Sequence, residues 1–216
     1  MSLDAPAPAD AKPALRGWVH AAGVVALGAS SPALFARCHG PAQVGWVSCF
    51  VAGVGLMMGV SALYHRVARS ERARRAWRVA DLTAIFCAIA GTGVAIAGLT
   101  LDPRDRLALV GAVAAAALAG LVLVRVMARP RWTAATYFLV VGWAAALFTP
   151  AISRGGGGAC AALVVAGGLS YSVGAVVYAA RRPRLSPRVF GFHELFHACT
   201  LVAVGCHFAA IYLALR

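Results

Sequence analysis

Charged side chains are scarce in this sequence. Only 12% of the 216 residues are Asp, Glu, Lys or Arg, about half the fraction found in soluble globular proteins, whereas 61% are hydrophobic. Such a chain has too few polar side chains to cover a water-facing surface, which argues against a soluble enzyme and against a disordered tail. Acids are the scarcest charged group, because 7 Asp and Glu stand against 20 Lys and Arg, for a formal net charge of +13. The composition therefore indicates either a basic nucleic-acid binder or a membrane protein whose positive charge is sorted to one side.

Lysine is almost absent, and the six cysteines contain no C-x-x-C pair. Lys12 is the single lysine, so the last apolar segment lacks the lysine that a retinal protein needs for its Schiff base. Five of the six cysteines lie in or at the edge of apolar segments, which is typical of small hydrophobic side chains rather than of metal ligands or a disulfide framework. The excess of Arg over Lys, with abundant Ala, indicates a bacterial chain encoded by GC-rich DNA.

Long apolar runs are what the sequence has instead. A membrane helix needs about 20 mostly apolar residues, and short connections with turn-forming residues separate seven such runs. We therefore predict an all-α membrane protein, with a short cytoplasmic tail at residues 1–16 and a seven-helix transmembrane domain at residues 17–216. The expected spans lie near Trp18–Phe35, Gln43–Leu63, Val79–Leu99, Leu107–Met127, Trp132–Ile152, Ala159–Ala180 and Phe190–Leu215.

The basic residues are distributed unevenly between the two sides of these spans. With a cytoplasmic N-terminus, 15 basic residues fall on the inner side and 5 on the outer side. The positive-inside rule therefore predicts a cytoplasmic N-terminus, an outer C-terminus and a multi-pass position in the cell membrane. A G-protein-coupled receptor would have its N-terminus outside, and nucleic-acid binding is not expected because the arginines are spread over several loops. The inner set is Lys12, Arg16, Arg66, Arg69, Arg72, Arg74, Arg75, Arg78, Arg125, Arg129, Arg131, Arg181, Arg182, Arg184 and Arg188.

Ionisable side chains within the spans are candidates for function, because they are expensive to place in lipid. Of the seven acids, only Asp81 and Glu194 lie in spans. In the predicted topology the second span ends, and the third and seventh begin, at the cytoplasmic face. The acids therefore share one membrane depth with three histidines, namely His65, His193 and His197.

The histidine spacing predicts a metal site. His193 and His197 are one turn apart on one helix face, and His65 would complete a three-His site with an open position for water, as in catalytic zinc sites. Ser61, one turn before His65, could hold that water or a substrate oxygen. Asp81 could accept a proton from the water, whose pKa a metal lowers towards about 7.

Each of these residues also has a structural interpretation. A single histidine at a helix end is usually interfacial, Asp81 could cap its helix, and Ser61 could pack between membrane helices. His193–His197 also matches the H-E-x-x-H pattern of zincins, with Glu194 as general base. An intramembrane metalloprotease would, however, need an acidic third ligand, which we do not find. Gly55 and Gly59 form a small-xxx-small pair that indicates helix packing. His207 lies ten residues beyond His197, about 15 Å along a helix, and cannot share the metal.

Together these motifs resemble the hemolysin III family, the bacterial branch of the progestin and adipoQ receptor superfamily. The resemblance rests on Ser61-Ala-Leu-Tyr-His65, on Arg78-Val-Ala-Asp81 and on Phe190-Gly-Phe-His193-Glu-Leu-Phe-His197 with His207-Phe208 beyond. It implies a seven-helix bundle and a zinc ion held by His65, His193 and His197, with Asp81 and Ser61 contacting or orienting the zinc-bound water. The receptor relatives are linked to hydrolysis of lipid amides such as ceramides. The family often has an acidic residue or Asn before the histidine of the first span, where this chain has Leu15-Arg16-Gly17-Trp18-Val19-His20.

We therefore expect a Zn²⁺-dependent hydrolase that acts on an amide or ester of a membrane lipid. One alternative is a non-enzymatic regulator or sensor of membrane homeostasis, in which a structural zinc ties the second and seventh spans together. Another is a cytolytic, hemolysin-like protein, although no amphipathic or charged-lumen span supports a pore. The sequence leaves open the substrate, the oligomeric state and the roles of Glu194 and His20.

Overall fold

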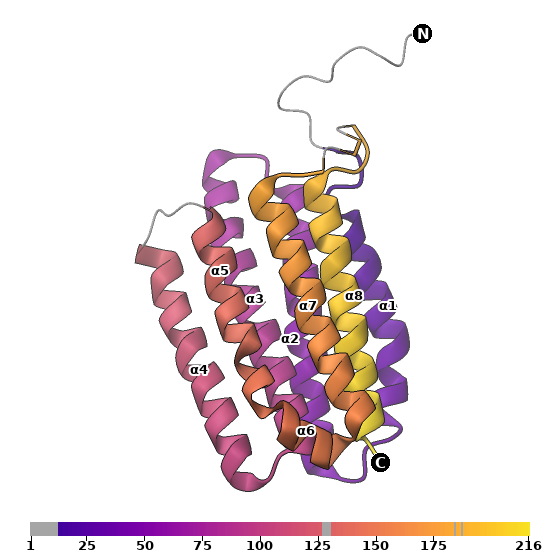
Figure 1. The fold of residues 1–216 in the computed structure, drawn as a ribbon. Helices are drawn as coiled ribbons and strands as arrows, with labels where there is room; N and C mark the ends of the chain where they lie inside the picture. Colours follow the sequence, from indigo (N-terminus) through magenta and orange to yellow (C-terminus); the bar gives the residue numbers. More distant parts are fainter. Residues whose placement is uncertain (1–12, 127–130, 184, 187) are drawn as a thin grey trace.

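The computed structural model describes residues 13–126, 131–183, 185–186 and 188–216, which form helices that run side by side in a bundle (Figure 1). Among these residues seven segments are long and apolar enough to cross a membrane, and α5, η1 and α6 together supply the fifth. This confirms the predicted all-α, seven-helix membrane architecture. The elements are α1 (Trp18–Phe35), α2 (Pro41–Val67), α3 (Glu71–Thr100), α4 (Pro103–Val126), α5 (Arg131–Gly142), the 3₁₀ helix η1 (Trp143–Phe148), α6 (Thr149–Gly156), α7 (Gly158–Ala180) and α8 (Phe192–Ala214).

The helix ends extend beyond the apolar runs at one end of the bundle. α2 continues to Val67, and α3 begins at Glu71, eight residues before the apolar run that predicted it. Ser70 caps α3, since its hydroxyl accepts a hydrogen bond from the backbone N–H of Ala73 at 3.2 Å. The sequence led us to expect Arg72, Arg74, Arg75 and Arg78 in a loop. The structure instead places these four arginines in the first turns of α3.

The fifth span is interrupted, although the sequence predicted one continuous helix. Pro150 has no backbone N–H, and its ring would clash with the carbonyl of Ala146, four residues earlier. That carbonyl instead accepts hydrogen bonds from the backbone N–H of Thr149 and from the Thr149 hydroxyl, the latter at 2.7 Å. The chain therefore tightens into η1 before α6 begins.

Glycines set the distance between α2 and α3. A Cβ atom on Gly53 would overlap the carbonyl of Cys87, and a Cβ atom on Gly91 would overlap the carbonyl of Cys49. The predicted pair, Gly55 and Gly59, does not have this role: Gly59 faces open space, and Gly55 meets only a Leu27 methyl group at 3.7 Å. Close packing of α2 thus depends on a glycine two residues earlier than predicted.

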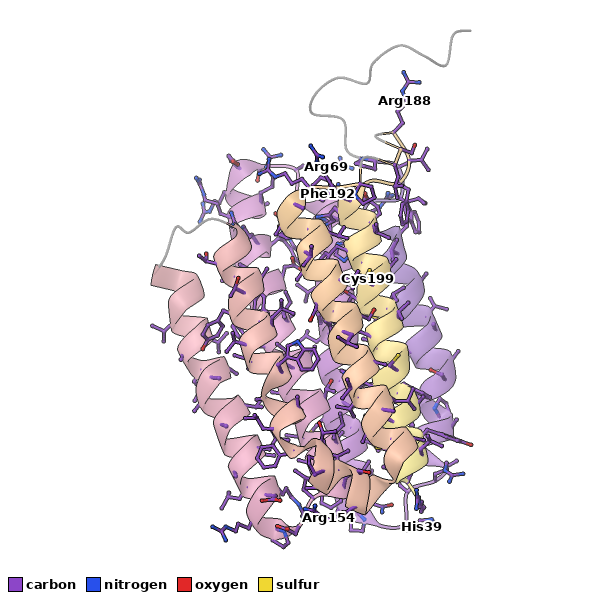
Figure 2. The ribbon with its side chains drawn as sticks, viewed as in Figure 1. His39, Arg69, Arg154, Arg188, Phe192 and Cys199 are labelled. Carbon is purple, nitrogen blue, oxygen red and sulfur yellow. The ribbon has the colours of Figure 1, made fainter. Side chains whose placement is uncertain are left out.

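The described termini lie at opposite ends of the bundle, as seven crossings require (Figure 1). Figure 2 shows Arg69 and Arg188 at the same end as Phe192, the first residue of α8, and His39 and Arg154 at the other end. The arginines of the predicted inner and outer sets that the figure labels are thus separated by the length of the bundle. Which end faces the cytoplasm stays a prediction. Residues 1–12, with Lys12, and the predicted inner residues Arg129 and Arg184 lie outside the described residues.

Candidate metal centre

Three histidines converge where α2 ends and α8 begins. One ring nitrogen from each of His65, His193 and His197 lies within 4.8 Å of the other two. The Nε2 atoms of His65 and His193 are 3.0 Å apart. Two nitrogens bound to one tetrahedral zinc at about 2.05 Å would be about 3.4 Å apart. The structure therefore brings the three predicted ligands together in a group that could hold a metal ion.

The surroundings of His197 fit such an ion. His197 is 4% exposed, and within the described residues its Nε2 atom is buried without a hydrogen-bond partner. Its other ring nitrogen, Nδ1, lies 2.8 Å from Nε2 of His20. A histidine that binds a metal through Nε2 carries its proton on Nδ1 and donates it to a neighbouring acceptor. A metal at the cluster would thus use the lone pair that otherwise has no partner, and imidazole nitrogens are ligands that zinc prefers.

His20 is the residue of this site whose role the sequence left open. It is 3% exposed, and its ring centroid lies 3.9 Å from that of His197. Gly17, the N-cap of α1, brings it there: φ at Gly17 is +84°, and a Cβ atom would stand 3.1 Å from both the Ala62 carbonyl and the His65 Cβ. His20 lies at the same predicted membrane depth as the other three histidines. This shared depth is the sequence signal that could have added His20 to the predicted site.

Glu194 does not have the position of a general base. It is fully buried, and both of its carboxylate oxygens are occupied. The Arg16 guanidinium donates to Oε1, and the backbone N–H of Gly191 donates to Oε2 at 2.9 Å. These contacts make Glu194 the capping residue of α8 and the partner of a buried ion pair. Glu194 is also absent from the wall of the cavity next to the histidines. The H-E-x-x-H spacing therefore has a structural explanation here.

Asp81 and Ser61 line the same cavity as the three histidines. Ser61 is 2% exposed and interacts with the Asp81 carboxylate through a side-chain hydrogen bond. Asp81 does not cap its helix, because α3 begins ten residues earlier and Ser70 caps it. The interpretation of Asp81 as a helix cap is therefore wrong, and its carboxylate lies in the wall of the cavity.

The cavity has a volume of about 410 Å³, within the range of small-molecule sites. Polar residues, the histidine cluster among them, line it towards the end of the bundle where α3 and α8 begin. Its deeper wall is mostly apolar, with residues from α3, α4 and α7 such as Ile96, Leu109, Val113 and Val164. His207 lies in this deeper part, where its Nε2 atom is 3.3 Å from the Val164 carbonyl. As predicted, His207 is not a member of the metal-binding group.

The chain matches a known protein family. The sequence model of the family described as haemolysin-III related matches residues 10–208, nearly the whole chain. The matched region includes all three histidines of the cluster together with His20, Ser61 and Asp81. This is the family that the motifs around Ser61, Asp81 and His193 resemble.

Proposed function

This chain belongs to the haemolysin-III-related family, and on that premise we propose that it is a zinc-dependent hydrolase of the cell membrane that cleaves an amide or ester bond of a lipid. The observation that carries the proposal is the cavity inside the bundle. One end holds the His65, His193 and His197 cluster with Asp81, and the rest is largely apolar. A lipid would place its acyl chain along the apolar wall and its carbonyl at the polar end.

His65, His193 and His197 would hold the metal ion. When bound, zinc supplies a Lewis acid that polarises a carbonyl and lowers the pKa of a water molecule towards about 7. Three protein ligands are the number found in catalytic zinc sites, whereas structural sites close the fourth position with protein. Within the described residues no fourth His, Cys, Asp or Glu joins this group.

Asp81 would accept the proton of the attacking water, and Ser61 would orient Asp81. A general base is efficient only if its carboxylate is held in reach of that proton. A hydrogen bond from Ser61 would restrict the rotation of the Asp81 side chain, and the two residues lie on the closely packed helices α2 and α3. His20 would keep the His197 ring in the tautomer whose Nε2 atom binds the metal.

The test combines metal content with lipid hydrolysis. The protein is purified in detergent, its bound zinc is measured, and release of fatty acid is followed for a panel of amide and ester lipids. Asp81→Asn is expected to keep the zinc and to lose activity by about 10²- to 10⁴-fold, the usual contribution of a general base. His197→Ala is expected to lose the zinc. Asp105→Asn is the matched control, because Asp105 lies in the first turn of α4 and not in the cavity wall, and it should change neither quantity.

Three outcomes would contradict the proposal in different ways. A wild-type protein without zinc, or a His197→Ala variant with the wild-type content, would mean that the histidines do not form the metal site. Full activity in Asp81→Asn would remove Asp81 from the mechanism. Zinc retained without hydrolysis of any lipid would favour the regulator with structural zinc.

A further inference from the structure

The start of α3 carries four arginines, and they divide into two faces. Arg74 and Arg78 line the cavity, whereas Arg72 and Arg75 do not. Arg74 and Arg78 are four residues apart, and Asp81 follows after three more, so the three side chains lie on one face of the helix. The same 3- and 4-residue steps continue along the cavity wall from Asp81 through Ile85 to Ile96. Along this face of α3, two arginines are therefore followed by the Asp81 carboxylate and then by mostly apolar side chains.

The two cavity arginines lack strong acidic partners. Arg16, the third arginine of the cavity wall, is neutralised by Glu194. Arg74 pairs with Glu71 at 3.5 Å, but both side chains are exposed, and such pairs contribute little. Arg78 forms no ion pair within the part of the chain that the structure describes. Among the residues that line the cavity, the positive charge without a strong acidic partner is thus that of Arg74 and Arg78.

We propose that Arg74 and Arg78 bind the anionic headgroup of the substrate, so that the protein acts on acyl lipids that carry a carboxylate or phosphate close to the scissile bond. This proposal rests on the proposed function. Arginine forks recognise both anions through charge-assisted hydrogen bonds. Arginines that only set the orientation of the protein in the membrane could lie on any face of α3, as Arg72 and Arg75 do. Such a role does not explain why Arg74 and Arg78 line the cavity.

The helix geometry gives the spacing of such a ligand. Arg78 lies about 4.5 Å, and Arg74 about 10.5 Å, from Asp81 along the helix axis at 1.5 Å per residue. An anion held by the arginines is therefore a few bonds from a carbonyl at the depth of Asp81. Beyond Asp81 the wall continues for about 22 Å to Ile96, which is suited to one extended acyl chain. The substrate class is thus a single acyl chain joined by an amide or ester to a small anionic headgroup.

The experiment measures binding without requiring turnover. Zinc-loaded protein in uncharged maltoside micelles is titrated with N-palmitoylglycine, with N-palmitoylethanolamine, which has the same chain and amide but no charge, and with palmitoyl lysophosphatidic acid. The double variant Arg74→Gln/Arg78→Gln is compared with the matched control Arg72→Gln/Arg75→Gln, which removes the same charge from the same turns. Elution profile and zinc content show that each variant is folded.

Wild type should bind the two anionic lipids more tightly than the neutral one. The Arg74→Gln/Arg78→Gln variant should lose about tenfold or more in affinity for the anionic lipids, because it lacks the charge-assisted hydrogen bonds of both guanidinium groups, and should bind the neutral lipid as wild type does. The difference between the carboxylate and phosphate lipids shows which anion the arginines prefer.

Equal binding of neutral and anionic lipids by wild type would overturn the proposal, and so would an equal loss in the Arg72→Gln/Arg75→Gln control. These results are independent of hydrolysis. Anion preference without turnover of any lipid would leave the subsite standing and refute the hydrolase. Turnover without anion preference would support the hydrolase and refute the anion subsite.

Discussion

Replacing His20 by leucine tests whether this histidine positions a metal ligand. Leucine fills a similar volume in the buried site but cannot accept the hydrogen bond that Nδ1 of His197, 2.8 Å from Nε2 of His20, would donate when Nε2 of His197 binds a metal. The Nδ1 proton of His197 would then be buried without a partner, which costs about 1–3 kcal/mol. That penalty is largest in the tautomer that binds metal through Nε2, so it falls on the metal complex.

The expected effect is a loss of about 10- to 100-fold in zinc affinity, the range found when partners of metal-binding histidines are removed. This corresponds to about 1.4–2.8 kcal/mol at 1.4 kcal/mol per tenfold, in agreement with the cost of the unpaired Nδ1 proton. Zinc affinity is measured by competition with a chelator of known affinity. His20→Gln, whose amide oxygen can accept the same hydrogen bond, should recover part of the loss.

His207→Leu is the matched control for this experiment. His207 is another buried histidine of the bundle, but its contact is with the Val164 carbonyl and not with the cluster. Its replacement should leave zinc affinity at the wild-type value. Wild-type affinity in His20→Leu would refute the positioning role, and an equal loss in His207→Leu would show that any buried histidine is needed for the fold rather than for the metal.

Three further predictions follow from the packing and charge of the site. Glu194→Gln should weaken zinc binding, because the freed charge of Arg16 would oppose a cation at the histidines. Adding Arg16→Gln should restore the zinc affinity. A double variant that binds zinc like wild type but does not hydrolyse lipid would return Glu194 to the role of general base. Gly91→Leu should abolish folding, because its side chain would overlap the backbone of α2, whereas Gly59→Ala should fold normally; size-exclusion profiles in detergent measure both, and a folded Gly91→Leu would contradict the packing. Removing zinc with a chelator should lower both the melting temperature and lipid hydrolysis, and added zinc should restore them; a melting temperature unchanged by the chelator would mean that the folded protein holds no metal.

The histidine cluster, which could hold a metal ion, could be predicted because hydropathy and helical spacing are read directly from the sequence. Hydropathy locates the membrane segments, the i, i+4 spacing of His193 and His197 places two rings on one face, and the shared depth of His65 adds the third. The alternative interpretation of Asp81 as a helix cap was wrong because it placed the start of the helix at the start of the apolar run. Hydropathy marks where a segment becomes apolar, but the backbone hydrogen bonds of α3 continue through its arginine-rich first turns to Ser70. The start of an apolar run is therefore not the start of a helix.

The features that could not be predicted depend on contacts between distant parts of the chain. His20 and His197 are 177 residues apart, so only their shared membrane depth, and no spacing rule, connects the first helix with the last. The same applies to the choice between Gly53 and Gly59 in α2, because a pattern of small residues does not say which face meets a neighbour. Pro150 was visible in the sequence, but it lay inside an apolar run whose length alone satisfied the requirement for a span.

The segment before α1 brings a positive charge to the histidine cluster. Arg16 lies four residues before His20, and its side chain lines the same cavity as His197. A positive charge beside three imidazoles would oppose a divalent cation, most strongly in a buried site where the effective dielectric constant is low. Glu194 counters this repulsion through its ion pair with Arg16. Arg16 and His20, four residues apart, thus connect the start of α1 to Glu194 and His197 on α8 through one contact that neutralises charge and one that orients a ligand. A change at Arg16 in a related chain should therefore be accompanied by a change at Glu194.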